Sequence, residues 1–537
     1  MSLKGKSGAR AAMLVAVIAS VLFCISCGDE FRPVANPILQ PGGDPQRTSH
    51  VLAVSSNGAA RGSALIIDVS GDTAAALFSE QSCIQCGVGR NPVHATSLGG
   101  IDFVVNRADD SLSYFFLPTP PTGNLNPPNL VPLATGASPV FAAVAQSSLY
   151  VAETGRNSLA VVTSNAVSGY AESGEIPVGA DPVALVATPD STELYSLNQG
   201  DNTVSVIFPA INQNVQTIAL PAGATPVWGA VSSDGTRVFV VNQGTGTVSE
   251  INTVNNSRVP GTAPCTVDTF CVGPAPNYIV YEPILNRAYV TSPSGNSLSI
   301  IDNNLSTVQT VSLAGAPCNG QHPISVTALA DGTRVYVADD AANSVCVLDT
   351  KNNTFTKRIC LVQEPAATAP PTAPCVGSAT PISITSNSDA TRVYTANRYQ
   401  TAPVGIASIT RQNFTNPTTG LITGVVTVTT SAGVPFVAGH PVTVTVPNDA
   451  SFSGVFGITS VISATQFTYV QIGLSNSTPD STGATVAILP YVSLIQTSDN
   501  TLVINGNEAT DNTSLNLVTP PLTISAGGTP SFMVMTP

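Results

Sequence analysis

The chain has 537 residues, which is enough for several ordinary domains or for one large repeat structure with an insertion. Charged residues make up 9% and hydrophobic residues 43% of the chain, a composition that excludes a disordered protein. The net charge of −13 excludes nucleic acid as a partner, because no stripe of Lys and Arg is present to neutralise phosphates.

Residues 1–26 have the layout of a bacterial lipoprotein signal peptide. Basic residues precede an apolar run of thirteen residues, Ala11 to Phe23. This run is too short to span a bilayer as a helix, which takes about 20 residues. It ends in "CISC", Cys24 to Cys27, which resembles the lipobox of bacterial lipoproteins, although Cys24 stands where Leu is usual. The resemblance implies that the chain is cut before Cys27 and acylated on this residue. The alternative is an ordinary secretory signal with a chance cysteine.

Residues 27–49 are rich in Pro and Gly and are interpreted as a tether. The N-terminus therefore predicts an exported, lipid-anchored protein of the bacterial cell envelope, on a periplasmic or outer surface. Its first expected partner is the membrane, reached through the N-terminal lipid.

From residue 50 onward a short pattern recurs, in which an aromatic residue is followed by small or β-branched residues and a polar residue. Successive occurrences are 44 to 58 residues apart, a period typical of a propeller blade or a helical array. The local alternation has period two and is broken by Gly, Asn and Pro, which excludes helices. The aromatic positions are Phe103, Tyr150, Tyr195, Phe239, Tyr289, Tyr336 and Tyr394.

Each unit divides into four predicted strands. A strand that begins with Pro is followed by the aromatic strand, by a third strand such as "NSVCVLD" and by a fourth such as "NVQTIAL". Counting the strands that begin with Pro predicts an all-β fold with an eight-bladed propeller. They start at Pro92, Pro139, Pro182, Pro226, Pro276, Pro323, Pro381 and Pro530.

The motifs "RVYVAD", "RVFVVN", "RVYTAN" and "NTVSVI" resemble the YVTN-type β-propeller repeats of bacterial and archaeal surface proteins. This family is close in pattern to lactonase-type propellers. The resemblance covers roughly His50 to Ile409 and the last twenty residues. It implies a propeller, more often with seven blades than with eight, so seven is the alternative count.

Residues 50–410 are assigned to the blades and residues 491–537 to the last propeller strands. "HVLAVSSNG", from His50, is predicted to be the second strand of a blade that lacks its first, and "GGTPSFMVMTP" at the other end is predicted to be a first strand with nothing after it. Pairing the two would complete one blade and close the ring, which protects edges that a propeller otherwise exposes.

Residues 411–490 do not follow the blade pattern, although they alternate strictly. They resemble a small all-β module of bacterial surface proteins and phage tail proteins. The resemblance implies a role in spacing or adhesion.

Eight cysteines remain apart from Cys24 and Cys27, and an even number favours disulfides in an exported chain. For the CxxC pair, a redox pair or half of a metal site is the alternative. The eight are Cys83 and Cys86 in the CxxC, Cys265 and Cys271 in one loop, Cys346 and Cys360 on one predicted hairpin, and Cys318 and Cys375 ahead of successive strands that begin with Pro.

The chain contains no HExxH, GxSxG, phosphate-binding Gly loop or EF-hand spacing, so no catalytic residue, cofactor or metal site is predicted. The histidines, His50, His94, His322 and His440, lie far apart in sequence. His322 precedes a strand that begins with Pro and is a candidate for a ligand-binding face, with a polar loop residue as the alternative. The Asp or Asn that recurs after each aromatic strand is interpreted as a turn builder.

Two functions are compatible with this pattern. The first is a binding or scaffold protein of the cell surface, whose ligand is a carbohydrate or a protein. The second is a lactonase-like hydrolase with its site at the central channel, which rests on fold resemblance alone. The first is the prediction, and the protein is expected not to be an enzyme. Long connections from Arg258 to Ala275 and from Leu361 to Thr380 carry cysteines, which favours a ligand face on blades five to eight. The alternative is that these disulfides only brace long loops against proteolysis.

Overall fold

The structure is a computed structural model that describes residues 50–69, 73–78, 85–116, 126–165, 169–261, 265, 268–361, 374–375, 377–415, 422–438, 440–472, 477–502, 523–525 and 529–536. The predicted signal peptide and tether, with Cys24 and Cys27, lie outside the described residues, as does Cys83. No helix within the described ranges is both long and apolar enough to cross a bilayer.

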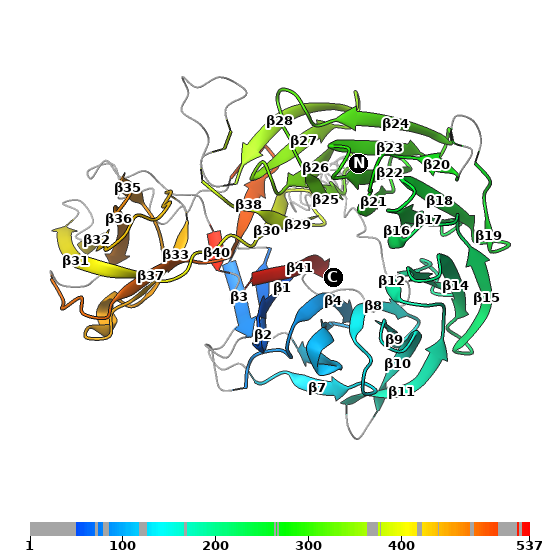
Figure 1. The fold of residues 1–537 in the computed structure, drawn as a ribbon, viewed down its shortest axis with the longest axis horizontal. Coiled ribbons are helices and arrows are strands. Elements are labelled where there is room, and N and C mark those ends of the chain that lie inside the picture. The colour runs from blue at the N-terminus through cyan, green and yellow to red at the C-terminus, as the bar shows by residue number, and fades with distance from the viewer. Residues whose placement is uncertain are drawn as a thin grey trace, which may run out of the picture. The chain divides into compact units, whose positions relative to one another are not determined.

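Eight antiparallel sheets surround a common axis, and the first strand of each sheet lies innermost (Figure 1). The predicted eight-bladed propeller is confirmed, and the alternative of seven blades is wrong. Blade 1 consists of β41 (Thr529–Thr536), β1 (His50–Asn57), β2 (Ala60–Asp68) and β3 (Thr73–Phe78), and blade 2 of β4 (Pro92–Leu98), β5 (Ile101–Asn106), β6 (Ser111–Phe116) and β7 (Asn129–Pro132). Blade 3 consists of β8 (Pro139–Ala145), β9 (Ser148–Glu153), β10 (Ser158–Asn165) and β11 (Gly169–Pro177), and blade 4 of β12 (Pro182–Ala187), β13 (Leu194–Asn198), β14 (Thr203–Phe208) and β15 (Gln213–Ala219).

Blades 5 and 8 have an outer strand in two pieces, and a short 3₁₀ helix (Arg107–Asp109) follows β5. Blade 5 consists of β16 (Pro226–Val231), β17 (Arg237–Asn242), β18 (Thr247–Asn252), β19 (Ser257–Arg258) and β20 (Phe270–Cys271), and blade 6 of β21 (Tyr278–Glu282), β22 (Arg287–Ser292), β23 (Ser297–Asp302) and β24 (Thr307–Ser312). Blade 7 consists of β25 (Pro323–Ala328), β26 (Arg334–Asp339), β27 (Ser344–Asp349) and β28 (Thr354–Cys360), and blade 8 of β29 (Pro381–Ser386), β30 (Arg392–Asn397), β38 (Tyr491–Gln496), β39 (Thr501–Leu502) and β40 (Thr523–Ser525).

Blade 1 is built from both ends of the propeller sequence, as predicted. β41 pairs antiparallel with β1, so that Met533 lies opposite Ala53 and Thr536 opposite His50. Blade 1 also contacts blade 2 through polar groups, because His50 Nε2 lies 2.7 Å from Asp102 Oδ2 and both side chains are buried. The two ends of the chain thereby close the ring.

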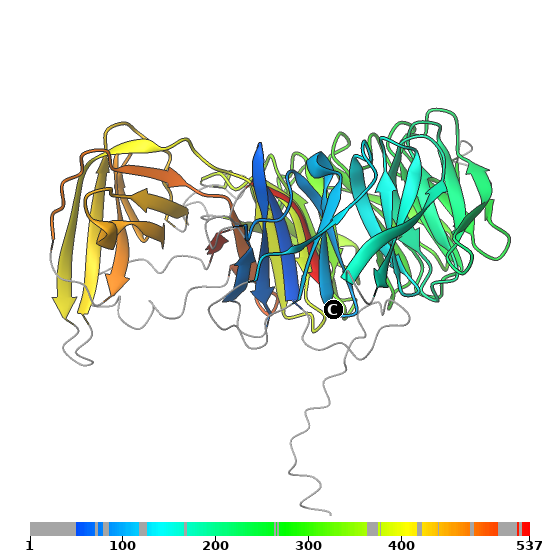
Figure 2. The same cartoon turned by 90° about the horizontal axis from the view of Figure 1, so that it is seen from below.

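The turns of every blade divide between two faces of the propeller (Figure 2). The turns between first and second strands and between third and fourth strands lie at one end of each sheet, which we call the turn face. The opposite end, with the remaining turns and the connections between blades, is the loop face. Turns of neighbouring blades touch at two places on the turn face: a Cβ at Gly235 of blade 5 would lie 3.2 Å from Pro189 of blade 4, and one at Gly332 of blade 7 would lie 3.2 Å from Ile284 of blade 6.

In three blades a Tyr of the repeat joins one blade to the next. Its hydroxyl donates to an Asn in the turn between the third and fourth strands of the following blade, and this Asn has the positive φ that Asn tolerates better than most residues. The aromatic ring itself is buried at all seven positions, and this shared burial explains why the pattern recurs. The pairs are Tyr150–Asn212 at 2.6 Å, Tyr195–Asn256 at 2.5 Å and Tyr336–Asn500 at 2.5 Å.

Apolar side chains of neighbouring blades pack together and form the core between them. Between blades 4 and 5, for example, Leu197 and Val206 pack with Val240 and Ile251. Alternate residues of the second and third strands face the two neighbouring blades, which is why these strands read as almost continuous apolar runs.

An inserted module interrupts the turn between β30 and β38. β31 belongs to the module and begins at Val404, so the predicted boundary at Arg411 is wrong. The reason is that the alternation of β31 resembles that of a third blade strand. The module has its own core, which includes Phe452, Phe467 and Tyr469. Its elements are β31 (Val404–Thr415), β32 (Ile422–Thr430), β33 (Pro441–Thr445), a 3₁₀ helix (Ala450–Phe452), β34 (Gly454–Gly457), β35 (Ser460–Ser463), β36 (Gln466–Ile472) and β37 (Thr485–Ile488).

Candidate functional site

Aromatic side chains from five blades meet at the propeller axis. The ring of Trp228 lies 5.2 Å from that of Phe141, 4.7 Å from that of Tyr278 and 6.3 Å from that of Phe532, centroid to centroid. Trp228 belongs to blade 5 and Phe532 to blade 1, so their contact crosses the axis. His94 of blade 2 completes this axial cluster, with its ring 3.8 Å from Phe141 and 4.4 Å from Phe532.

Every member of the axial cluster stands two positions after the Pro that leads its strand, as in "PVF" and "PVW". A β-bulge follows the Pro in blades 2, 3 and 5, and bulges re-aim the side chains beside them. Blades 4, 7 and 8 have the small residues Ala184, Ser325 and Ser383 at this position. These small residues leave room for the rings of the other blades. The spacing from Pro is the signal in the sequence that could have revealed the cluster.

The titratable groups of the axial cluster are neutral at physiological pH. Burial lowers the pKa of His94 to about 3, and its Nδ1 accepts a hydrogen bond from the backbone N–H of Ala142 at 3.3 Å. Burial also raises the pKa of Tyr278 to about 12. The hydrolase hypothesis places its site at this axis, where the structure places the aromatic rings of the axial cluster. Among the described residues, no group of three or more His, Cys, Asp or Glu side chains is arranged to hold a metal ion.

The loop face carries a polar group that includes the candidate residue His322. Its Nδ1 lies 2.7 Å from Asp340 Oδ1, and Asp340 Oδ2 lies 3.9 Å from Arg398 Nη2. The side chains of His322 and Arg398 are about half exposed, at 47% and 51%, whereas that of Asp340 is exposed by only 16%. His322 is therefore accessible at the surface, and its carboxylate partner is fixed beneath it.

The structure settles the pairing of six cysteines, which the sequence leaves open. Register explains why the two cysteines of the predicted β27–β28 hairpin do not pair with each other: Cys346 lies opposite Arg358, and Cys360 lies opposite Ser344. Cys86 is also disulfide-bonded, which agrees with the structural interpretation of the CxxC motif. The disulfides are Cys265–Cys271, Cys318–Cys346 and Cys360–Cys375.

Two of these disulfides fix connections on the loop face. Cys318 lies in the connection that leads to His322, and it is joined to Cys346 in the third strand of blade 7. Cys375 lies in the connection from blade 7 to blade 8, and it is joined to Cys360 at the end of β28. Cys318, Cys346 and Cys360 are at most 1% exposed, so these bonds brace the face from beneath.

The long segment after Arg258 lies elsewhere than predicted. β19 pairs with the end of β18 and β20 with its start, so residues 259–269 form an excursion from the outer strand of blade 5. The expectation that Cys265 and Cys271 lie in a connection between blades is therefore wrong, because Cys271 belongs to the outer strand, where it lies opposite Thr247 at the loop-face end of β18. The physical reason is that the chain returns to complete the outer strand after the excursion.

A buried carboxylate fixes this excursion. Asp268 is fully buried, and its Oδ2 accepts hydrogen bonds from Asn242 at 2.8 Å, Thr247 at 2.9 Å and Ser249 at 2.6 Å. Its Oδ1 lies 3.1 Å from Nη1 of Arg258. The carboxylate thus replaces the solvent that these groups would otherwise bind.

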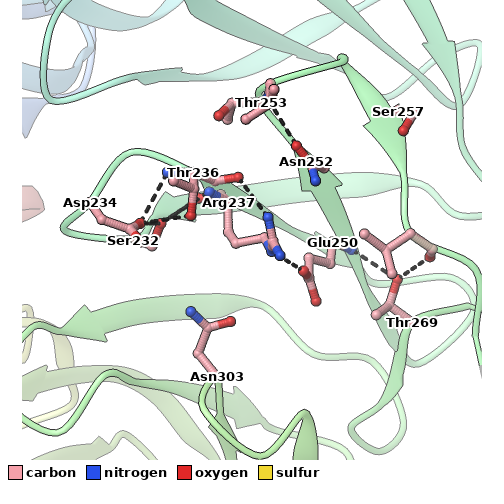
Figure 3. A network of polar contacts seen from close by, with 12 residues as sticks. Ser232, Asp234, Thr236, Arg237, Glu250, Asn252, Thr253, Ser257, Thr269 and Asn303 are labelled. Atoms are coloured by element: carbon pink, nitrogen blue, oxygen red, sulfur yellow. Dashed lines mark hydrogen bonds and ion pairs between the residues drawn. The ribbon is translucent and has the colours of Figure 1, made fainter.

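The polar contacts of the excursion continue to the turn face of blade 5 (Figure 3). Thr269 Oγ1 accepts from the backbone N–H of Glu250, whose carboxylate lies 2.5 Å from Arg237 Nε. Burial raises the pKa of Glu250, and the guanidinium of Arg237 opposes this shift. At the adjoining turn, Asp234 accepts from Ser232 at 2.6 Å. The network orders a turn and an excursion within one blade.

The recurring polar residue after the aromatic strand acts within its own blade. Asn106 Nδ2 donates to Ser113 Oγ at 2.9 Å, and Asn198 Nδ2 donates to Ser205 Oγ at 3.0 Å. Asp339 instead accepts from the backbone N–H groups of the connection at His322, at 3.0 Å. These bonds tie the second strand to its neighbour or to the loop above it, in agreement with a structural interpretation.

His440 of the module contacts the connection from blade 7 to blade 8. Its Nε2 lies 3.0 Å from the carbonyl oxygen of Ser378, and its ring lies 5.6 Å from that of Tyr399. Burial lowers the pKa of His440 to about 4. The folded protein therefore holds this imidazole neutral at neutral pH.

Acid is expected to destabilise the protein through His440. Because its pKa is lowered from 6.5 to about 4, the unfolded chain takes up a proton before the folded chain does, and stability is lost as the pH falls through this interval. The loss from this residue is roughly 3 kcal/mol. Urea unfolding at pH 7 and pH 4 should show a smaller difference for His440→Gln than for the wild type. An equal difference for His440→Gln and for the wild type would contradict the assignment.

Comparisons with known proteins give no family for the chain. No protein-family model matches it, and no curated protein matches it. Solved structures that resemble it include a 6-phosphogluconolactonase-like protein from Bacteroides fragilis, with 18% identity, a TM-score of 0.44 and coverage of 58% of this chain and 95% of that one. A periplasmic gluconolactonase from Pseudomonas aeruginosa gives 16% identity, a TM-score of 0.44 and the same coverage. Apo AztD from Citrobacter koseri gives 14% identity, a TM-score of 0.45 and coverage of 66% and 91%. Likeness at these identities concerns the fold alone.

Proposed function

We propose that this β-propeller is exported, anchored by a lipid on Cys27, and acts as a binding or scaffold protein of the bacterial cell envelope. The observation that carries the proposal is the construction of the loop face at blades 7 and 8. Two connections there are fixed by buried disulfides, and they present the half-exposed His322 and Arg398 around the carboxylate of Asp340.

A face fixed in this way is suited to binding. Connections that are already ordered lose little conformational entropy when a ligand binds. Imidazole, carboxylate and guanidinium groups supply hydrogen-bond donors and acceptors of the kind that recognise sugar hydroxyls or the polar groups of a protein surface. We therefore place the ligand, a surface carbohydrate or a protein, over His322 and Arg398.

The anchor is tested by fractionation of cells that produce the Cys27→Ser variant. We expect the wild type in the membrane fraction with incorporated palmitate, and the variant without palmitate and released from the membrane. Wild-type protein that incorporates no palmitate would refute the lipid anchor.

The binding face is tested by hydrogen exchange of the purified protein with and without isolated envelope polysaccharide or envelope protein. Protection is expected in peptides that contain His322 and Asp340, and it should be lost in Arg398→Ser. Lys351→Ser, which removes a cation from the opposite face, is the matched control and should keep the protection. Protection confined to the turn face or to the module would contradict the proposal.

A further inference from the structure

Exposed apolar side chains of the propeller gather on the turn face. Among the described residues, none of the large exposed apolar side chains lies in a turn or connection of the loop face. Six of these exposed side chains lie at or next to the turn face: Phe116 (62%), Phe208 (37%), Ile211 (56%), Val254 (83%), Ile284 (60%) and Leu305 (70%). The other two of the propeller lie on outer strands, Leu130 on β7 and Val215 on β15.

The turns themselves do not need these apolar residues. The strained position in each turn is taken by a polar neighbour with positive φ, as at Asn212 and Asn256. Blades 7 and 8 make the same turn between third and fourth strands with Lys351-Asn352 and with Ser498-Asp499. The apolar tips at Ile211, Val254, Ile284 and Leu305 are therefore a property of blades 4 to 6, and we call these four residues the apolar tips.

The chain enters the propeller at this same face. β1 is the second strand of its blade, and His50 at its start lies opposite Thr536 at the end of the first strand, which is the register of a first turn. Forty-nine residues precede His50, and the predicted acylated residue, Cys27, is among them. The bilayer that holds the lipid is thus connected to the turn face.

The tether alone does not bring the turn face to the bilayer. The segment 27–49 could reach about 80 Å when extended, so the anchored propeller is free to stand away from the membrane or to turn over. The apolar tips lie on the face at which the chain enters, although on blades 4 to 6 and therefore across the axis from blade 1. They would favour the orientation in which the turn face meets the bilayer, because apolar side chains at an amphipathic surface partition into the headgroup region.

The geometry points to a membrane-docking surface: the apolar tips of blades 4 to 6 enter the headgroup region of the bilayer to which the N-terminal lipid is attached. This inference rests on the proposed lipid anchor. The net charge of −13, together with Asp190 and Asp234 in turns of the same face, favours a zwitterionic lipid surface over an anionic one. Docking in this way directs the loop face, with His322, away from the membrane.

Depth-dependent quenching of tryptophan fluorescence tests the inference on the acylated full-length protein. In a Trp228→Phe background, Leu305→Trp places a single reporter on an apolar tip, and Ile462→Trp, 57% exposed in the wild type, places the matched control on the module. Both proteins are reconstituted into phosphatidylcholine vesicles with and without bromine in the upper part of the acyl chains. We expect the bromine to remove about half of the Leu305→Trp emission and little of the Ile462→Trp emission.

A second variant, with Ser at Ile211, Val254 and Ile284, should reduce the quenching at position 305. Vesicles with added anionic phosphatidylglycerol should reduce it as well. Equal emission of Leu305→Trp in brominated and unbrominated vesicles would overturn the docking surface while leaving the lipid anchor intact. A protein that carries no palmitate would remove the anchor and the docking surface together. An acylated protein that is dimeric in detergent and becomes monomeric with the Ser substitutions would assign the apolar tips to self-association instead.

Discussion

Truncation after Gly528 is expected to unfold the propeller or to destabilise it severely. β41 supplies the innermost strand of blade 1 and buries Met533, and Phe532 contributes to the axial cluster. Burial of these side chains and of Val534 and Met535 stabilises the fold by about 5 kcal/mol. The truncation would also expose the inner edge of β1, a template for aggregation.

Urea unfolding followed by circular dichroism measures this effect. Removal of Pro537 alone, which leaves β41 complete, is the control and should have no measurable effect. A synthetic peptide of residues 529–537 is expected to restore part of the lost stability. An unchanged unfolding midpoint after truncation would mean that β41 does not close the ring.

Asp268→Ala is expected to have the next largest effect. The substitution leaves the buried hydroxyl and amide donors of Asn242, Thr247 and Ser249, and the guanidinium of Arg258, without the carboxylate that they now contact. Removing one partner from a buried group of this kind costs about 3 to 5 kcal/mol. Peptides spanning residues 242–258 should also exchange amide hydrogens faster.

Two controls separate the buried contacts from the loss of a charge. Asp234→Ala removes a carboxylate from an exposed turn of the same blade and should cost less than about 1 kcal/mol. Asp268→Asn keeps the size but turns an acceptor into a donor, so it should fall between the two. Equal unfolding midpoints for Asp268→Ala and Asp234→Ala would contradict the role assigned to Asp268.

The blades could be predicted because each repeats one set of local rules. The Pro that leads the first strand, the aromatic second strand and the turn residues are used in nearly every blade, so the pattern stands out from a single sequence. Ring closure followed from the same pattern, because a second strand at His50 without a first and a first strand near Pro530 without a second can complete only each other.

The candidate sites were harder to predict because each occurs once and depends on contacts between distant segments. Spacing suggested that Cys346 and Cys360 share a hairpin, which they do, but the register sets them opposite other residues, and each pairs with a cysteine of a connection. His322 could be singled out by its place before a strand, whereas its partner Asp340 and the nearby Arg398 come from two further segments.

The insertion between β30 and β38 has a consequence for what the propeller can carry. Asn397 at the end of β30 lies directly opposite Tyr491 at the start of β38, so the chain leaves and re-enters the blade about 5 Å apart, as across a tight turn. A whole domain therefore occupies a place where other blades use four residues, such as Gln243 to Gly246 between β17 and β18. The insertion shows that the turn between the second and third strands of a blade can hold a folded domain with neighbouring ends while the flanking strands keep their antiparallel register.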